Sequence, residues 1–286
     1  MRGQNKTVLI TGSTSGFGKG FVSAFLKDGW IVVATLRNAK TRLHLFSDYQ
    51  KEIESKKLFL HDLDVTQELE RNRLQSWFEN EHAGQLDCLI NNAGYGLEGA
   101  LEDYSDAQLR DQFNVNFFGS VSMIRGFLPL LKKSKGRVIQ ISSVLGCTSL
   151  PLSSAYVSSK HAIEGMIEAL VYEVMPFGVQ LALIEPGAFA TGFEGSKVRG
   201  VNCLKKESPY TEMTQAFGRA REKILAKVAG DPKVVVRDVL ALANKRKIPL
   251  RTVCGKDAKF NFLLKTFTTR NGYHRLMRAV FARILR

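Results

Sequence analysis

The sequence predicts an α/β protein with a doubly wound, mostly seven-stranded parallel sheet, helices on both faces, and a helical C-terminal extension. Apolar runs rich in β-branched residues alternate with longer segments of helical periodicity, as in strands joined by crossover helices. These runs are apolar throughout rather than at every second residue, which indicates strands covered on both faces. A glycine-rich turn joins the first run to the first helical segment, and its chemistry is considered below.

The elements follow in chain order from these patterns. The predicted strands are 7–11, 31–36, 57–61, 86–90, 137–141, 179–184 and 250–254. The predicted helices are 17–27, 67–81, 106–132, 154–176, 213–228 and 231–243. The last helix should begin with Asp231 as N-cap and Pro232 at its first position. Composition does not change before about residue 190, and the different segment 192–230 is interpreted as a functional loop, so residues 1–255 are expected to form one domain, with 256–286 as a basic extension.

Charge and composition exclude several classes of protein. Residues 245–286 hold 12 Lys and Arg and one acidic residue, Asp257, so this segment carries +11 of the net +14 and leaves +3 for the rest. Because the fold itself is not basic, we expect no nucleic-acid partner. The four cysteines and five histidines lack the spacing of disulfide frameworks or metal sites, so no metal is expected. Without room for a signal peptide or an apolar run of about 18 residues, a cytoplasmic protein is expected.

A glycine-rich turn follows the first predicted strand and precedes a helix. Glycines there let the backbone approach a pyrophosphate, whose charge the free N–H groups of the helix start can bind. Glycines also make ordinary turns, but the order of strand, glycines and helix distinguishes a Rossmann-type dinucleotide site. The predicted cofactor contacts in this turn are Gly12, Ser13, Ser15, Gly16, Phe17 and Gly18.

The end of the second predicted strand bears on the choice of cofactor. An NAD site favours an acidic residue there to accept a hydrogen bond from the ribose 2′-hydroxyl. Leu36 stands at that position and Arg37 follows it. Since a guanidinium can pair with a 2′-phosphate, Arg37 predicts NADP(H) in preference to NAD(H), although an isolated strand-end Arg would ordinarily be a solvated side chain.

Ser143, Tyr156 and Lys160 are the candidate catalytic residues. Tyr156 and Lys160 are four residues apart on a predicted helix and therefore share one face. An ammonium near a phenol favours the phenolate and lowers the phenol's pKa from about 10. Tyr156 would then donate a proton to a carbonyl oxygen, or remove one from a hydroxyl, while Ser143 holds the same oxygen for hydride transfer.

The ordered set of motifs resembles the short-chain dehydrogenase/reductase family in its single-domain form. The set comprises the glycine turn, Asn91-Asn92-Ala93-Gly94, Ser143, and Tyr156 with Lys160 thirteen residues after the serine, and the resemblance spans residues 6 to about 192. It implies an oxidoreductase acting on CH–OH groups. It also implies that Lys160 binds the nicotinamide ribose and that Asn116 continues a proton relay through water. The further cofactor contacts that it implies are Asp64, Val65, Asn91, Ala93, Gly94, Pro186, Gly187 and Thr191.

The substrate pocket should be walled by segments after the Asn-Asn-Ala-Gly motif, after Ser143 and after Pro186. The predicted wall residues are Tyr95, Leu97, Val144, Leu145, Cys147, Leu150, Phe189 and Phe193. An apolar wall suits a small hydrophobic substrate, with polarity kept for the reacting oxygen. Some of these side chains would fill the core instead. The C-terminal region resembles hydroxysteroid and retinol dehydrogenase-like members, which implies a steroid-, retinoid- or lipid-like substrate.

The basic C-terminal segment carries an apolar stripe with helical spacing: Tyr273, Leu276, Met277, Val280, Phe281, Ile284 and Leu285. An amphipathic helix of this kind can dock on the protein as a lid or subunit contact, and it can also contact anionic lipid as a peripheral membrane helix. Both remain alternatives at this point. A homo-oligomer, a dimer or a tetramer, is expected.

Two other classes of function compete with catalysis. A non-catalytic NADP sensor would need the glycine turn and Arg37, but it would not need the complete set of Asn116, Ser143, Tyr156 and Lys160. A membrane-associated binding protein would depend on the C-terminal helix rather than on the cofactor site. The sequence therefore favours an NADP(H)-dependent oxidoreductase.

Overall fold

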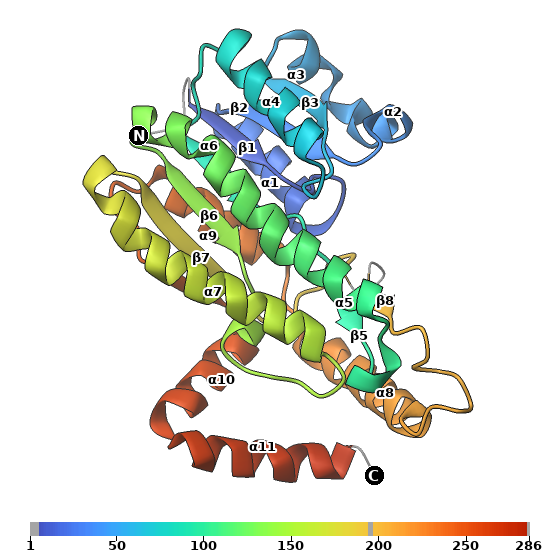
Figure 1. The fold of residues 1–286 in the computed structure, drawn as a ribbon. Helices are drawn as coiled ribbons and strands as arrows, with labels where there is room; N and C mark the ends of the chain where they lie inside the picture. Colours follow the sequence, from blue (N-terminus) through green and yellow to red (C-terminus); the bar gives the residue numbers. More distant parts are fainter. Residues whose placement is uncertain (1–5, 194–196, 285–286) are drawn as a thin grey trace.

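The computed structural model describes residues 6–193 and 197–284, and its centre is a seven-stranded parallel sheet of order β3-β2-β1-β4-β6-β7-β9 (Figure 1). The strands are β1 Thr7–Ile10, β2 Ile31–Leu36, β3 Leu58–Asp62, β4 Cys88–Asn91, β6 Arg137–Ile141, β7 Gln180–Pro186 and β9 Arg251–Cys254. The predicted fold class is confirmed, and the predicted strands differ from these only at their ends. The chain reverses its winding direction between β1 and β4, where open parallel sheets bind ligands at the carboxyl ends of the strands.

Helices cover both faces of the sheet, which explains why the strands are apolar throughout. Successive side chains of a strand point to opposite faces, so Val8 and Ile10 belong to one core and Leu9 to the other. The first face packs against α1 (Gly16–Lys27) and α9 (Lys233–Asn244). The second face packs against α4 (Glu68–Asn80), α6 (Ser120–Ser134) and α7 (Ser154–Val174). Both cores are thus built from the same strands.

The predicted helix 106–132 is three elements rather than one. α5 (Asp106–Phe113) begins at Ser105, whose side chain forms a capping box with Gln108. A π-helical segment (Asn114–Gly119) follows and leads directly into α6. Apolar periodicity does not reveal such a segment, because the wider turn changes the register by one residue without interrupting the helix. π-Helical turns of this kind occur often at functional sites.

Several short elements lie outside the predicted pattern. Between β2 and β3 the chain forms α2 (Ala39–Arg42), a 3₁₀ segment (Leu43–Tyr49) and α3 (Gln50–Glu54). β5 (Leu97–Glu98) and β8 (Val198–Arg199) pair in parallel as a second, two-stranded sheet. The remaining 3₁₀ segments are Leu101–Asp103, Val144–Gly146 and Met175–Phe177. α9 begins one residue later than expected, at Lys233, with Pro232 as N-cap, although Asp231 still accepts a hydrogen bond from the Lys233 N–H.

The C-terminal region forms two helices where the sequence pattern indicated one. α10 (Lys256–Phe267) follows β9 at Gly255, and α11 (Arg270–Ile284) comes after a short break. α11 crosses below the sheet domain near α8 (Thr211–Val228) and α10 (Figure 1). Tyr273 is buried there, whereas Leu276 remains exposed and Leu285 lies outside the described residues. None of the helices in the described ranges is long and apolar enough to cross a membrane.

Candidate active site

A cavity of about 1420 Å³ lies at the carboxyl ends of the strands and brings most of the predicted site residues together. The predicted residues that line it are Gly12, Ser15, Gly16, Phe17, Arg37, Asp64, Val65, Ala93, Gly94, Tyr95, Leu97, Ser143, Val144, Leu145, Leu150, Tyr156, Lys160, Pro186, Gly187, Phe189, Thr191 and Phe193. They come from the segments that follow β1, β2, β3, β4, β6 and β7, including the starts of α1 and α7. Because the carboxyl ends of parallel strands lie at the same edge of the sheet, motifs that are distant in the sequence meet at one site.

Four predicted site residues support the cavity from behind and do not line it. The Ser13 hydroxyl donates to the Ile10 carbonyl over 3.0 Å, and the Asn91 amide donates to the Ser120 carbonyl over 3.0 Å. Gly18 lies against the main chain of the turn, and a Cβ there would stand 2.1 Å from the Gly12 oxygen. The fourth residue, Asn116, is described below. Ser13, Gly18 and Asn91, which were predicted as cofactor contacts, thus do not line the cavity.

The glycine turn is held open by a residue that the sequence analysis did not single out. The Asn92 side-chain amide donates to the carbonyl oxygens of Thr11 and Gly12, each over 2.9 Å. Gly12 and Gly16 have φ values of +69° and +52°, a backbone conformation that favours glycine. The sequence identifies Asn92 as the second residue of the Asn-Asn motif, but only the structure shows that its side chain binds the glycine turn. The turn thus presents the start of α1 to the cavity.

Positive side chains line the part of the cavity near β2. Arg37 follows β2, and Arg42 on α2 lines the same wall. Arg71 on α4 lines the cavity as well and donates to the Val65 carbonyl over 2.7 Å. The sequence pattern identified Arg37 alone, because the short helix that carries Arg42 has no periodic signal. This wall offers guanidinium groups suited to a phosphate.

Lys160 is buried, and its ammonium group donates to the Ile141 carbonyl over 2.9 Å. Its nitrogen lies 5.7 Å from the centre of the Tyr156 ring, one turn earlier on α7. Burial lowers the pKa of Lys160 to about 8, and the negative charge of Glu164 opposes this effect. The lysine can therefore act as a cation beside the tyrosine at neutral pH.

Ser143 and Tyr156 face the cavity from different elements. The Ser143 hydroxyl accepts a hydrogen bond from the Leu145 N–H over 3.1 Å at the start of a 3₁₀ turn, which fixes the side chain at the end of β6. The Tyr156 ring lies 5.9 Å from the ring of Phe193, centre to centre. A carbonyl group placed between the serine and the tyrosine would meet two hydroxyl groups and an apolar ring.

Asn116 occupies the middle of the π-helical segment, but its side chain is engaged elsewhere. The amide donates to the Tyr95 carbonyl over 3.0 Å and to the Ser159 hydroxyl over 3.1 Å, and its oxygen accepts from the Tyr95 N–H. It therefore fixes the loop after β4 against α7. Its side chain does not line the cavity, so a proton relay would have to involve its main chain.

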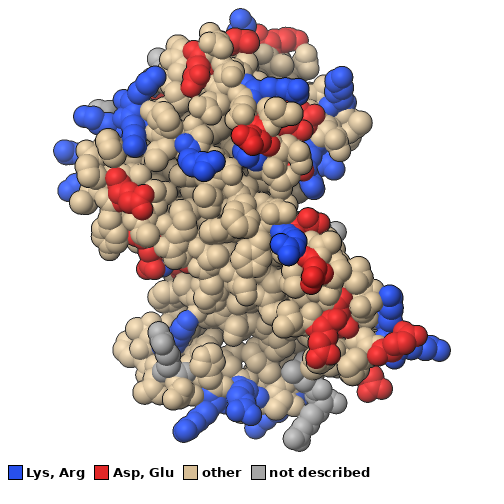
Figure 2. All heavy atoms as spheres, in the orientation of Figure 1, with Lys and Arg blue, Asp and Glu red and all other residues tan. Residues whose placement is uncertain are grey.

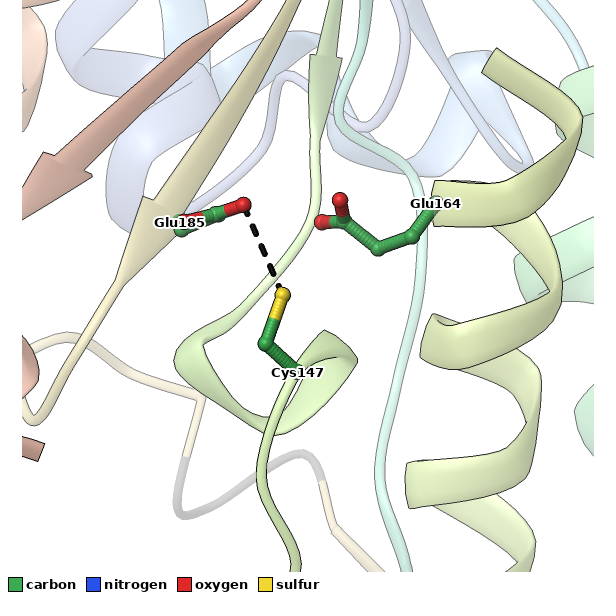
Figure 3. Close-up of side chains that lie close together, drawn as sticks. All are labelled: Cys147, Glu164 and Glu185. Carbon is green, nitrogen blue, oxygen red and sulfur yellow. Dashed lines mark hydrogen bonds between the residues drawn. The ribbon is translucent and has the colours of Figure 1, made fainter. Parts of the chain in front are cut away.

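The cavity extends beyond the predicted walls. The apolar residues of α8 and α11 that line it are Phe217, Ala220, Ile224, Leu225, Val228, Tyr273, Met277, Val280, Phe281 and Ile284, and Arg221 of α8 lines it as well. The apolar stripe of the C-terminal helix thus faces the cavity in part, which supports the alternative of docking on the protein. Cys147 is the exception among the predicted walls, because its thiol points toward Glu185 at 3.7 Å instead of into the cavity (Figure 3).

Comparisons with known proteins agree with this geometry. A family model described as short chain dehydrogenase matches residues 6–202. The chain is 36% identical over 256 residues to a 3-ketodihydrosphingosine reductase of Bacteroides thetaiotaomicron, covering 88% of each protein. It is 31% identical over 254 residues to retinol dehydrogenase 8 of Homo sapiens, covering 86% of this chain and 80% of that one. A short-chain dehydrogenase structure from Streptomyces avermitilis matches with a TM-score of 0.79 at 29% identity, covering 96% and 99% of the chains.

The family match and the cavity support the same conclusion. The matched segment contains the glycine turn, the Ser143 loop, and Tyr156 with Lys160, and these meet at one cavity. Motifs that are each weak alone are specific in this order and this geometry. The chain therefore belongs to the short-chain dehydrogenase family and is an oxidoreductase.

Proposed function

We propose that this chain is an NADP(H)-dependent oxidoreductase that reduces a carbonyl group, or oxidises a secondary alcohol, on a large hydrophobic substrate. The observation that carries the proposal is the continuity of one cavity. It runs from the arginines near β2, past Tyr156 and Lys160, to an apolar wall formed by α8 and α11. The arginines suit a cofactor phosphate, Tyr156 and Lys160 suit the reacting oxygen, and the apolar wall suits the lipophilic part of a substrate.

The proposed chemistry assigns one task to each catalytic side chain. Bound nicotinamide would supply or accept the hydride. Tyr156 would donate a proton to the substrate oxygen during reduction or remove one during oxidation, and Ser143 would hold that oxygen by a hydrogen bond. Lys160 would stabilise the phenolate form of Tyr156 by its charge and hold the nicotinamide ribose. Asn116 would keep the loop after β4 in place.

NADP(H) is preferred in this proposal because of the positive wall near β2. Arg37 and Arg42 both line the cavity there, and β2 ends in Leu36 rather than in a carboxylate. A 2′-phosphate would gain charge-assisted hydrogen bonds at this wall, whereas a 2′-hydroxyl would find no acidic acceptor from the end of β2.

A steroid-, retinoid- or lipid-like substrate is proposed from the size and chemistry of the cavity. Its volume of about 1420 Å³ exceeds the roughly 300–1,000 Å³ of ordinary ligand pockets, which leaves space for a substrate beside the cofactor. Met277 and Phe281 on α11, and Ile224 on α8, make the distant wall apolar. Two relatives carry the names 3-ketodihydrosphingosine reductase and retinol dehydrogenase, both of which indicate lipophilic substrates.

Peripheral membrane contact is proposed for α10 and α11 of an otherwise cytoplasmic protein. Phe260, Leu263 and Phe267 lie on one face of α10 and are 65%, 56% and 80% exposed. In Figure 2 the lower edge of the molecule, where α11 lies in Figure 1, carries blue side chains beside broad tan areas. Exposed aromatic rings beside cations suit an anionic lipid surface, from which a lipophilic substrate could enter.

The proposed architecture is a catalytic domain at 1–255 with the extension at 256–286 serving as one wall of its cavity. A homo-oligomer, a dimer or a tetramer, is part of the same proposal. Exposed apolar side chains on the elements around α5 and α7 support it, among them Leu101, Phe118 and Tyr172. No nucleic-acid partner is proposed.

The test of the proposed function is a panel of lipophilic ketones and alcohols assayed by the absorbance of NADPH. Turnover is expected with bulky apolar ketones. Tyr156→Phe should lower kcat at least about 100-fold, the usual contribution of a proton donor, while NADPH still quenches the protein fluorescence. Turnover that survives Tyr156→Phe would remove the tyrosine from the proposed chemistry.

A further inference from the structure

A cluster of one half-buried and two buried polar side chains lies outside the cavity wall, behind the catalytic turn and one helical turn from Lys160. Cys147, Glu164 and Glu185 bring a thiol and two carboxylate oxygens within 4.8 Å of one another (Figure 3). Glu164 is 4% exposed and Glu185 is fully buried. Buried carboxylates are costly unless they are compensated, so their presence here needs a physical reason.

Arg251 on β9 compensates the cluster and joins two elements of the site. Its Nε donates to Glu185 over 3.1 Å and one terminal nitrogen donates to Glu164 over 3.0 Å. The other terminal nitrogen donates to Glu168 over 2.7 Å, where the carboxylate side chain is 53% exposed. One guanidinium thus connects the catalytic helix α7 to the strand β7 that leads into Pro186 and Gly187.

Glu164 also contacts the turn that carries Ser143. A Cβ on Gly146 would lie 2.8 Å from Cγ and 3.0 Å from Oε1 of Glu164, so only glycine leaves room for this carboxylate. The same Cβ would stand 2.8 Å from the Ser142 hydroxyl. Glu164 Oε1, Glu185 Oε2 and the Ser142 hydroxyl are buried with no hydrogen-bond partner in the described structure. The packing therefore holds the Glu164 carboxylate in one place between the Ser143 turn and α7.

A divalent cation fits this cluster poorly, although its ligand atoms are close together. Arg251 already supplies a positive charge to both carboxylates. Burial raises the pKa of the Cys147 thiol to about 12, with Glu164 and Glu185 adding to the effect, so the thiol is neutral beside the two carboxylates. Burial and the negative charge of Glu164 also raise the pKa of Glu185 to about 7. A proton on Glu185 therefore removes part of the negative charge that a cation would otherwise have to balance.

Lys160 lies one helical turn from this cluster. Glu164 follows it by four residues on α7 and therefore lies on the same face of the helix. Burial lowers the pKa of Lys160 and favours the neutral amine, whereas the negative charge of Glu164 favours the ammonium. The other charged or titratable groups around the cluster are Glu168 on α7, Glu185 on β7, Arg251 on β9, Cys147 on the turn and Lys265 on α10.

We propose that Glu164, held in place by Arg251, is a positioning residue whose carboxylate, one helical turn from Lys160 on the same face of α7, stabilises the ammonium form of Lys160 beside Tyr156. This inference rests on the proposed function, because it gives Lys160 a task in that reaction. It assigns Glu164 no contact with substrate or cofactor. Arg251 in turn ties the helix of Lys160 to the strand before Gly187, so the two walls of the nicotinamide end keep their spacing.

The experiment follows the titration of Lys160 directly, using full-length protein labelled with ¹³C at lysine Cε. The NMR signal that disappears in Lys160→Met identifies the residue. The midpoint of its titration is expected near 8 in the unaltered protein and about one pH unit lower in Glu164→Gln, because an attractive charge has been removed. A Glu164→Gln midpoint equal to that of the unaltered protein would overturn the proposal.

Glu168→Gln is the matched control, since Glu168 pairs with the same guanidinium one turn further along α7 and is half-exposed. It should leave the midpoint close to that of the unaltered protein, and an equal fall in both variants would refute a specific role for Glu164. Glu164→Met removes the same charge without a buried amide and replaces Glu164→Gln if that variant does not fold.

Turnover separates this inference from the proposed function. In Glu164→Gln the alkaline limb of kcat should move to lower pH together with the NMR midpoint, and Glu164→Asp should restore part of both. If no lipophilic ketone is reduced but the midpoint still falls, the proposed function fails while the influence of Glu164 on Lys160 stands. If ketones are reduced and the midpoint does not move, the inference fails alone.

Discussion

The Asp257 carboxylate accepts a hydrogen bond from the Ala188 N–H over 2.7 Å and so ties the first turn of α10 to the segment after β7. The carboxylate packs directly against Gly187, where a Cβ would come within 2.3 Å of either oxygen. The cavity wall at Pro186 and Gly187 is thus supported by the C-terminal extension. A negative charge in the first turn of a helix also interacts favourably with the helix dipole.

Asp257→Ala should therefore destabilise the protein and weaken NADPH binding together. Loss of the acceptor leaves the Ala188 N–H without its partner, which costs about 1–3 kcal/mol of unfolding free energy. Urea unfolding and a fluorescence titration with NADPH measure the two effects. Asp257→Asn keeps an acceptor oxygen and should retain most of both. An unchanged NADPH affinity in Asp257→Ala would separate α10 from the cofactor end of the site.

Arg37→Ala and Arg42→Ala should each weaken NADPH binding about 10- to 100-fold and leave NADH binding nearly unchanged. A hydrogen bond to a charged group contributes about 1.5–3 kcal/mol, and only NADPH carries the 2′-phosphate. Lys40→Ala is the control, because Lys40 lies on α2 beside Arg42 and is not among the residues that line the cavity. Equal losses for NADPH and NADH would contradict a 2′-phosphate contact.

Vesicle binding tests the proposed membrane face of α10. The protein should bind vesicles of phosphatidylserine and phosphatidylcholine more tightly than vesicles of phosphatidylcholine alone, because cations flank the exposed rings. Replacing Phe260 and Phe267 by Ser should lower vesicle binding at least about tenfold, since these exposed rings would be buried in the lipid on binding and supply the apolar contact. Leu69→Ser on α4 removes a side chain of similar exposure, 72%, far from α10 and should have no effect. Unchanged vesicle binding after both ring substitutions would exclude this face of α10 as the membrane contact.

Stability should fall as the pH drops below neutral, because of a histidine cluster beside β3. Burial, followed by the nearby charge of His82, lowers the pKa of His61 to about 4, and burial also lowers the pKa of His82. The unfolded chain takes up a proton at His61 near pH 6.5 whereas the folded chain does so only near 4, so stability decreases as the pH falls through this window. The His61 ring lies 4.3 Å from that of Trp77, whose fluorescence can report unfolding.

The measurement is urea unfolding at several pH values between 7.5 and 4.5, with His61→Gln as the comparison. Carboxylates contribute to the same slope in both proteins, so the difference between the slopes isolates the imidazole. His61→Gln should show the shallower dependence on pH. Parallel slopes in the two proteins would show that His61 does not titrate with folding.

Local patterns were enough to predict the sheet and the motif end of the site. Each strand is an uninterrupted apolar run, and burial on both faces requires such runs wherever the strand lies. Gly12, Ser143, Tyr156 and Lys160 belong to motifs whose spacing is local, and parallel strands bring them to one edge of the sheet. These features could therefore be predicted without knowing how distant segments pack.

Tertiary packing decided the features that depend on distant contacts. Arg251 meets Glu164 and Glu168 from 87 and 83 residues away, a separation that no local pattern records. Asn116 and Cys147 turn away from the cavity because partners from other elements, Tyr95 and Glu185, engage their polar groups. The apolar stripe of α11 could be predicted from the sequence, but the surface that it packs against could not. Hydrophobic burial is non-directional, so only the neighbouring elements decide which surface a helix covers. The sequence by itself thus determined the strands, the motifs and their chemistry, while the tertiary structure decided which of those side chains face the cavity and what holds them there.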